Sequence, residues 1–328
     1  MRWIFVTVLT LIVSVNINSQ QVFLKKEPFA HTYSIVARDT ITGEMGVAVQ
    51  SHWFSVGSLV IWGKAGVGVV ATQSFVNPSF GPRGISLLEN GLTPKLAVKT
   101  LLELDENREV RQLAILDAHG NVEAFTGKNC IDAAGHIIGD NFSVQANLMD
   151  KNTVWPAMAE AFKNAKGSLA ERMLTAMEAA QKEGGDIRGK QSAAILVVKA
   201  KSTGNSWEDK VVDLRVEDND NPLQEMRRLL TIHTAYEFMN KGDLAVETGD
   251  NTFAKEYYMN AQKLNPDNLE MKYWFAITLA NNGELIEAKK ILKDIFKQNS
   301  KWKELTPRLI KPKLLTISNQ ELQEILKL

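Results

Sequence analysis

The chain has 328 residues, which exceeds the roughly 100–150 residues of a typical domain and therefore favours two domains. Apolar residues make up 45% of it and charged residues 23%, a balance that excludes a collagen-like, coiled-coil or mainly disordered chain. The 38 basic residues balance the 38 acidic ones, so net charge gives no reason to expect nucleic acid or an anionic membrane as a partner.

The N-terminal residues 1–19 have the pattern of a secretory signal peptide. Arg2 supplies a positive charge, and the apolar run that follows, Ile4 to Val15, is well short of the about 20 residues that span a membrane. The only cysteine, Cys130, lies far downstream, so we expect no lipid anchor after this run. We expect residues 1–19 to be removed, residues 20–31 to form a propeptide or linker, and the mature protein to be secreted or periplasmic and free of the membrane.

Alternating and β-branched runs then predict strands, with helices between some of them. Two hairpins are expected, of 33–38 with 45–50 and of 110–116 with 122–126, and further strands are expected at 59–62, 67–72, 193–199 and 211–216. The expected helices lie at 92–104, 154–165 and 169–183. Strands followed by paired helices and then by strands indicate a layered α+β domain and not a βαβ repeat, and we place this domain at residues 32–220.

Residues 221–328 have an almost entirely helical pattern. Residues 235–268 and 269–302 align at an offset of about 34 residues, the tetratricopeptide period. The aligned small residues are Gly249 with Gly283 and Ala254 with Ala288. We therefore predict a tetratricopeptide-like domain of two helical hairpins and a last helix near 319–327, with a generic helical bundle as the alternative. Because such repeats usually need three or more units for stability, we expect this domain to be stabilised by packing against the first domain.

Familiar site motifs are absent from the sequence. It contains no dinucleotide or phosphate loop, HExxH, GxSxG or EF-hand motif, and no two of the five histidines have the i, i+4 spacing of a helical metal site. We therefore predict no metal and no cofactor. Polar segments instead begin or end several predicted strands, and together they favour a site that orients polar groups around a substrate. These segments are Gln50–Phe54, Gln73–Pro78 with Gly81–Gly84, Phe142–Asn147 and Asp186–Ser192. Turn and strand-end capping would explain any one of them alone.

Several long blocks of the chain carry a family resemblance. The stretch HTYSIVARDTITGEMGVAVQSHWFSVGSLVIWGKAGVGVVATQSFVNPSFGPRG resembles the start of the DUF1028 family, an uncharacterised family placed among the N-terminal-nucleophile hydrolases. GKNCIDAAGHIIGDNFSVQANLM, GGDIRGKQSAAILVV and VVDLRVEDNDNPLQEMRRLL resemble later blocks, so the resemblance covers roughly residues 31–232 in order. It implies a four-layer αββα sandwich, but it supplies no substrate, because the function of the family is unknown.

The resemblance also implies a nucleophile. In N-terminal-nucleophile hydrolases a Thr, Ser or Cys becomes the first residue after processing, and its free α-amine acts as general base for its own side chain. Thr32 precedes the first predicted strand and fits this role, with Ser34, on the same strand face, as the fallback. Thr32 could equally be a β-former at a strand start. Because residues 1–31 precede it, the mechanism needs a cut between His31 and Thr32, by autoproteolysis or by another protease.

The remaining candidate residues are neutral and charged groups at strand ends. With Thr32, the catalytic candidates are Ser51 and His52, which we expect to support the reaction through oxyanion stabilisation. The substrate-binding candidates are Gln50, Gln73, Asn77, Asn147, Asp186, Arg188 and Gln191. Among these, Asp186, Arg188 and Gln191 are expected to orient the amine or to grip a substrate carboxylate.

Two functions from different classes follow. The first is a secreted hydrolase in which Thr32 attacks an amide or peptide-like carbonyl of a small molecule or peptide. The second is an inactive αββα domain that serves, with the tetratricopeptide-like tail, as a protein- or peptide-binding module. The sequence leaves the oligomeric state open, a homo-oligomer included.

Overall fold

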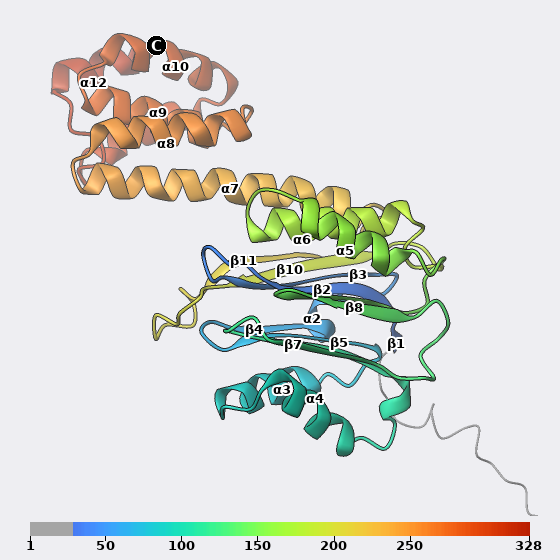
Figure 1. The fold of residues 1–328 in the computed structure, drawn as a ribbon. Helices are drawn as coiled ribbons and strands as arrows, with labels where there is room; N and C mark the ends of the chain where they lie inside the picture. Colours follow the sequence, from blue (N-terminus) through green and yellow to red (C-terminus); the bar gives the residue numbers. More distant parts are fainter. Residues whose placement is uncertain (1–28) are drawn as a thin grey trace, which may run out of the picture.

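A computed structural model describes residues 29–328, so the predicted signal peptide, 1–19, and residues 20–28 of the predicted propeptide or linker lie outside the described residues. The described part of the chain is a mixed α/β unit with two antiparallel sheets, followed by a C-terminal helical region (Figure 1). Within this part, none of the helices is both long and apolar enough to cross a membrane.

The six-stranded sheet has the order β11-β10-β3-β2-β9-β8. Its strands are β2 (Thr32–Arg38), β3 (Met45–Ser51), β8 (Gly135–Gly139), β9 (Phe142–Ala146), β10 (Ser192–Val198) and β11 (Lys210–Val216). The expected hairpin of β2 and β3 is confirmed, with Arg38 opposite Met45 at the turn and Thr32 opposite Ser51 at the far end. This register places the predicted nucleophile beside the polar residues that end β3.

The five-stranded sheet has the order β1-β5-β6-β7, and β4 also pairs with β5. Its strands are β1 (Phe29–Ala30), β4 (Ile61–Lys64), β5 (Gly68–Phe75), β6 (Arg111–Asp117) and β7 (Val122–Thr126). The hairpin of β6 and β7 was also expected, and its register is antiparallel throughout. β1 comes directly before β2 in the chain, so the chain passes from one sheet to the other at His31.

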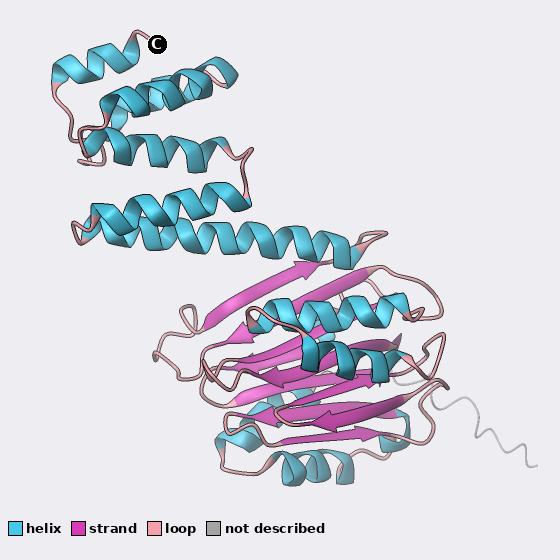
Figure 2. Ribbon diagram, turned by 45° about the horizontal axis from the view of Figure 1, so that its top comes forward, coloured by secondary structure: helices cyan, strands magenta, loops and turns pink. Residues whose placement is uncertain are grey.

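The two sheets stack face to face, and helices cover their outer faces (Figure 2). Successive side chains of a strand point to opposite faces of its sheet, so alternate residues lie in the core between the sheets and in the core under the helices. In β5, Val69 and Ala71 lie in the core between the sheets, whereas Val70 packs under α3 (Phe80–Glu89) and α4 (Pro94–Glu103). On the other side, α5 (Val154–Asn164) and α6 (Leu169–Lys182) pack on the outer face of the six-stranded sheet.

Four elements, α2 (Gly57–Val60), β8, β9 and α3, differ from the sequence expectation. The segment expected as a strand at 59–62 begins as α2, a short helix, and only then continues as β4. β8 and β9 were not expected as strands. Helix α3 was also not expected, because Gly81, Pro82 and Gly84 are residues that usually interrupt helices. Proline costs little in the first turn of a helix, and a Cβ on Gly81 would lie 2.2 Å from the Trp62 indole, so only glycine lets α3 approach β4 this closely.

The C-terminal region consists of helices joined by short turns. They are α7 (Pro222–Glu247), α8 (Asn251–Leu264), α9 (Leu269–Asn281), α10 (Leu285–Gln298), α11 (Lys301–Leu305), a 3₁₀ turn (Thr306–Leu309) and α12 (Asn319–Leu326). Gly249 and Gly283, the glycines aligned in the sequence, both have positive φ, at 78° and 81°, in the turns after α7 and α9. The two aligned units therefore each contain a helical hairpin.

Helix α7 joins the helical region to the sheets. Its first part, with Met226 and Leu230, packs in the core under α6, and its second part, with Ala235 and Met239, belongs to the core of the helical region. At 26 residues and about 1.5 Å per residue, it is long enough to serve both cores.

Candidate functional site

Three hydroxyl residues stand side by side at one end of the six-stranded sheet. Thr32 of β2 is opposite Ser51 of β3, and Ser51 is opposite Ser192 of β10. Opposite residues in an antiparallel sheet share a face, and Val36, four residues after Thr32, and Val49, two residues before Ser51, lie in the core between the sheets. All three hydroxyl residues are fully buried. The hydroxyl row therefore faces the second sheet.

The peptide bond before Thr32 is held by two donors. The His31 carbonyl oxygen accepts a hydrogen bond from Ser51 Oγ at 2.5 Å and another from Arg188 Nη2 at 2.9 Å. Thr32 Oγ1 donates to the Ala30 carbonyl at 2.5 Å, which fixes the orientation of the hydroxyl. Two donors on one carbonyl oxygen, one of them cationic, would stabilise negative charge that develops on that oxygen.

Asp186 positions the guanidinium of Arg188. Its carboxylate accepts from Arg188 Nε at 3.0 Å and from Arg188 Nη2 at 2.7 Å, and it also accepts from the backbone N–H of His52 at 3.2 Å. The Asp186 side chain is fully buried, and that of Arg188 is 28% exposed. A two-point ion pair of this kind holds a planar guanidinium in one orientation.

Two amide side chains contact the backbone of the candidate nucleophile. The Thr32 carbonyl accepts from the backbone N–H of Asn147 at 3.1 Å and lies 3.3 Å from Gln73 Nε2 and 3.5 Å from Asn147 Nδ2. Gln73 belongs to β5 of the other sheet, and Asn147 follows β9. Both predicted residues therefore lie at Thr32, where they fix its backbone.

Buried glutamines connect these amides into a network between the sheets. Gln112 Oε1 accepts from Gln73 Nε2 at 2.6 Å and from Asn147 Nδ2 at 2.8 Å. Its Nε2 donates to Thr126 Oγ1 at 2.8 Å, and that hydroxyl contacts His136 Nδ1 at 2.8 Å. Sequence reasoning missed Gln112, although a glutamine within the apolar run of β6 was a signal for such a partner.

The chain just upstream of Thr32 covers the site. β1 pairs antiparallel with β5, Phe29 opposite Phe75 and Ala30 opposite Ser74. His31 is only 3% exposed, its ring meets the Phe75 ring edge-on at 5.2 Å between centroids, and its Nδ1 lies 2.8 Å from Asn147 Oδ1. Burial lowers the pKa of His31 below its usual value, and the nearby Arg188 charge adds to this, while the hydrogen bond with Asn147 and the Asp186 charge oppose it. The lowered pKa favours the neutral form of the imidazole.

Gln50 and His52 lie beside the hydroxyl row but face away from it. Gln50 accepts a hydrogen bond from the Tyr33 hydroxyl on the helix-covered face of the sheet. The His52 side chain is exposed, with its Nδ1 3.4 Å from the Lys190 carbonyl. The expectation that the His52 imidazole supports the reaction is therefore not met by the geometry, since strand alternation turns it outward and only its backbone N–H contacts Asp186.

Asn77 and Gln191 also lie apart from Thr32. Asn77 Nδ2 donates to Asp105 at 3.2 Å, and its Oδ1 accepts from Ser79 just before α3. Gln191 Nε2 donates to Asp218 at 3.1 Å near the surface. Asn77 thus holds the turn before α3 and a loop 28 residues away, and Gln191 holds a loop 27 residues away, which is a structural role.

No metal site accompanies these groups in the described part of the chain. Among residues 29–328, no three His, Cys, Asp or Glu side chains come close enough together to hold a metal ion.

Comparison with known proteins places the chain in a family. A family model described as "Family of unknown function (DUF1028)" matches residues 32–226. The chain belongs to the DUF1028 family. A solved structure from the same family, protein SPO2555 from Silicibacter pomeroyi, is 31% identical, with a TM-score of 0.57 over 62% of this chain and 87% of that chain. No curated protein sequence matches the chain.

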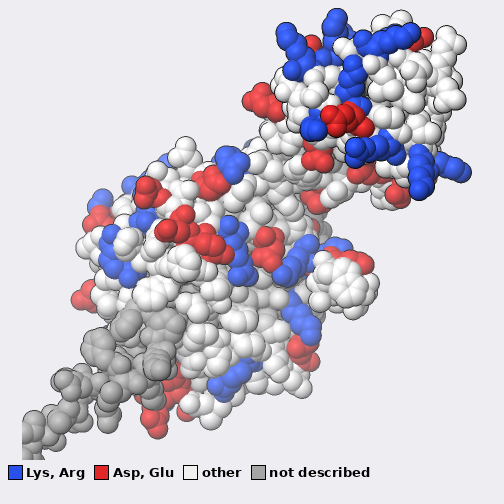
Figure 3. All heavy atoms as spheres, turned by 180° about the vertical axis from the view of Figure 1, so that it is seen from behind, with Lys and Arg blue, Asp and Glu red and all other residues white. Residues whose placement is uncertain are grey.

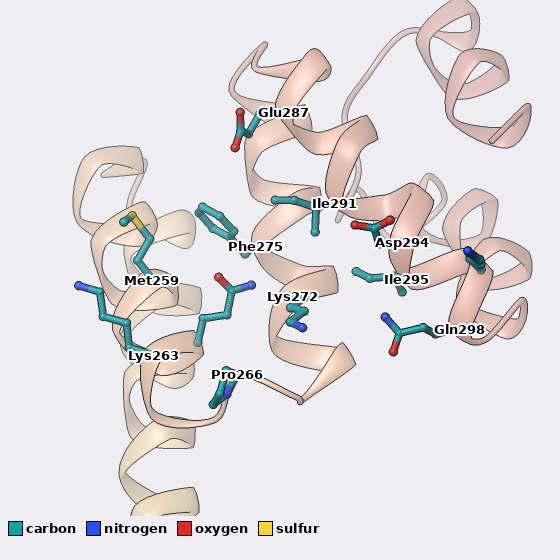
Figure 4. A pocket seen from close by; sticks show the side chains of 12 residues that line it. Met259, Lys263, Pro266, Lys272, Phe275, Glu287, Ile291, Asp294, Ile295 and Gln298 are labelled. Carbon is teal, nitrogen blue, oxygen red and sulfur yellow. The ribbon is translucent and has the colours of Figure 1, made fainter.

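The DUF1028 match begins at Thr32, so the segment that covers the site lies outside it. Most of the helical region, from residue 227 on, lies outside the match as well. That region contains a groove of about 950 Å³ between α8, α9 and α10 (Figure 4). Phe275, Ile291 and Ile295 contribute its apolar lining, and Lys263, Lys272 and Lys297 are among its polar residues. Lysine and arginine side chains gather over this end of the molecule (Figure 3).

Proposed function

We propose that residues 32–220 form an N-terminal-nucleophile hydrolase, a four-layer αββα sandwich in which Thr32 cleaves an amide or peptide-like C–N bond outside the cytoplasm. The observation that carries this proposal is the His31 carbonyl, held by Ser51 Oγ and Arg188 Nη2 next to a buried threonine hydroxyl. The bond that must break to free the Thr32 amine is thus the bond whose oxygen already has two hydrogen-bond donors.

The first reaction is cleavage of the chain itself. Thr32 Oγ1 attacks the His31 carbonyl carbon, the C–N bond to Thr32 breaks, and the hydroxyl proton passes to the leaving nitrogen, which becomes the free α-amine. Ser51 and Arg188 stabilise the negative charge on the His31 oxygen during this step. Water then hydrolyses the ester between His31 and Thr32 Oγ1 and releases the upstream chain as a carboxylic acid.

The second reaction is turnover of a substrate at the same place. An N-terminal amine has a pKa of about 8, so the Thr32 amine is partly neutral at physiological pH. It accepts the hydroxyl proton as Oγ1 attacks the substrate carbonyl carbon. The substrate carbonyl oxygen takes the position left by the His31 oxygen, between Ser51 and Arg188. The substrate C–N bond breaks, and the protonated Thr32 amine returns its proton to the leaving nitrogen, so that the substrate amine departs and Thr32 Oγ1 carries the acyl group. Water then hydrolyses this ester, with the Thr32 amine again as base, and releases the acid.

Substitution of Thr32 tests this proposal through hydrolysis of peptidyl aminomethylcoumarin amides. We expect Thr32→Ala to abolish release of the coumarin and Thr32→Ser to retain part of it, because serine keeps a hydroxyl beside the same amine. Thr72→Ala is the matched control, since Thr72 is a buried threonine on β5 that bonds to the Asn77 carbonyl, away from His31. Full activity of Thr32→Ala would contradict the proposal, and loss of activity in Ser34→Ala alone would favour the fallback nucleophile.

A second candidate function is peptide binding by the helical region, which we propose is tetratricopeptide-like. The groove between α8, α9 and α10 supports this function, because its apolar lining suits an extended peptide and its three lysines outnumber its two carboxylates, Glu287 and Asp294, which favours acidic side chains on that peptide. Fluorescence anisotropy with a labelled acidic peptide tests it. We expect Lys272→Glu to weaken peptide binding. Lys241 lies outside the groove, so Lys241→Glu should leave binding unchanged. Equal binding by both variants would contradict this function.

A further inference from the structure

We propose that the segment Phe29–His31 occupies the acyl half of the substrate site, so that the processed enzyme takes extended peptides with a histidine side chain just before the cleaved bond. This inference rests on the proposed function and names its substrate class. Three separate contacts of the segment carry it: its backbone pairing, the seat of its last side chain, and the position of its last carbonyl.

The backbone contact is β-strand addition to β5. β1 pairs with Ser74 and Phe75, whereas β4 occupies the same edge of β5 only from Gly68 to Ala71. Release of residues upstream of Thr32 would therefore remove the strand that pairs with β5 beside Ser74, while the Phe75 carbonyl keeps its hydrogen bond from Arg111 Nη1. Free N–H and C=O groups at such an edge are the usual docking site for an extended peptide.

The side-chain seat is built around Asn147. The Asn147 amide nitrogen donates to Gln112 Oε1 at 2.8 Å, so its Oδ1 is left as an acceptor for His31 Nδ1 at 2.8 Å. Asn147 is fully buried, and the Phe75 ring closes the seat edge-on. An aliphatic side chain in this seat would leave the Asn147 oxygen buried without a donor, which is costly. A carboxylate would bring a second acceptor against it.

Burial favours the neutral ring. It is the main cause of the lowered pKa of His31, and the Arg188 charge acts in the same direction, whereas the hydrogen bond to Asn147 and the Asp186 charge oppose it. The carbonyl that follows the seated residue lies on Ser51 and Arg188. A peptide that repeats the contacts of Phe29–His31 would thus present its carbonyl to the Thr32 hydroxyl in the arrangement proposed for self-cleavage.

The test compares three substrates on the chain that begins at Thr32, obtained by self-cleavage or by removal of an N-terminal fusion. The substrates are acetyl-Phe-Ala-His, acetyl-Phe-Ala-Leu and acetyl-Phe-Ala-Asp aminomethylcoumarin amides. We expect kcat/KM for the histidyl substrate to exceed the others by at least about tenfold, the effect of one unpaired buried acceptor. We expect Asn147→Ala to remove this preference, and Asn164→Ala, an exposed asparagine on α5, to keep it.

A binding measurement separates this inference from the proposed function. Acetyl-Phe-Ala-His as the free acid is titrated into the same chain, with acetyl-Phe-Ala-Leu as comparison. Thr32-dependent hydrolysis without preference for histidine would overturn the inference and leave the hydrolase proposal standing. Binding that favours the histidyl peptide and depends on Asn147, without any hydrolysis, would uphold the peptide seat and overturn the hydrolase proposal. Neither hydrolysis nor selective binding would overturn both.

Discussion

At the scale of single residues, Arg188 is the group on which the proposed chemistry depends most. It is the cationic donor to the His31 carbonyl, and its orientation comes from a buried carboxylate, Asp186. Ser51, the other donor, is fixed by strand register. The two donors therefore reach one oxygen from different elements, a loop and a strand, and the site forms only when the sheet and this loop are both in place.

Substitution of Arg188 should slow self-cleavage. We expect Arg188→Met to reduce the rate on the order of 100-fold, as for loss of one oxyanion donor. Arg188→Lys should recover part of the rate, because lysine keeps the charge but loses the two-point contact with Asp186. The measurement is the fraction of chain cut between His31 and Thr32 over time. Arg228→Met, which removes an exposed arginine paired with Glu225 on α7, is the control; equal rates in both variants would remove Arg188 from the mechanism.

The buried His31 gives the unprocessed chain a pH dependence. Its pKa is lowered in the folded state, so its contribution to stability is complete above the unfolded value of about 6.5 and is lost as the pH falls from there through the folded pKa. In a Thr32→Ala chain, which keeps the upstream segment, we expect urea unfolding to show a fall in free energy below this pH. His31→Gln in the same chain should make the fall smaller, and His136 accounts for part of the remainder, since burial lowers its pKa too. An unchanged pH profile in the double variant would contradict the seat described for His31.

At the scale of elements, local patterns predicted more of the fold than of the site. The helix at 92–104 forms as α4, with Thr93 as its cap, and the hairpins of β2 with β3 and β6 with β7 follow from turn residues and alternation. The placement of Thr32 beside Ser51 follows from the first hairpin. By contrast, β8, β9 and α3 were missed, because their glycines and polar residues are tolerated only through packing on distant strands.

The site contacts depend on chain segments that are far apart in the sequence. Arg188 reaches His31 across 157 positions, and Asn147 reaches His31 across 116 positions. Local patterns marked Asp186, Arg188 and Asn147 as polar strand-end residues, but they could not distinguish them from His52, Asn77 and Gln191. His31 itself was treated only as a cut position, since no local signal shows that its side chain has a buried partner.

The helical hairpins offer a test of the repeat alignment. Ala254 is fully buried in the core of the helical region, and Gly242 lies where a Cβ would be 2.6 Å from the Tyr258 ring, so α7 and α8 pack closely. We expect Ala254→Leu to lower the free energy of unfolding by about 1–3 kcal/mol through overpacking. Thr252→Ala, at an exposed position on the same helix, should change it by less than about 0.5 kcal/mol. Urea unfolding measures both, and a silent Ala254→Leu would contradict the close approach of these helices.

At the scale of the whole molecule, α7 makes the helical region and the sheets one continuous structure. Met226 is fully buried in the core beneath α6, and Ala235 is fully buried in the core of the helical region. The ion pair of Arg227 with Glu178 also joins α7 to α6, but both side chains are about a third exposed, so it adds little. The helical region is therefore attached through apolar packing on the helix-covered face, and the hydroxyl row lies on the other face of the same sheet.

The intact mass of the purified mature protein tests the central claim most directly, because every step at Thr32 needs a free amine there. We expect a mass that corresponds to residues 32–328, with a free threonine as the first residue by N-terminal sequencing. The Thr32→Ala chain should instead keep residues upstream of position 32, in the same host and under the same purification. A wild-type protein that begins at Gln20, Gln21 or Met1, with the His31–Thr32 bond intact, would contradict the claim that this chain is an N-terminal-nucleophile hydrolase.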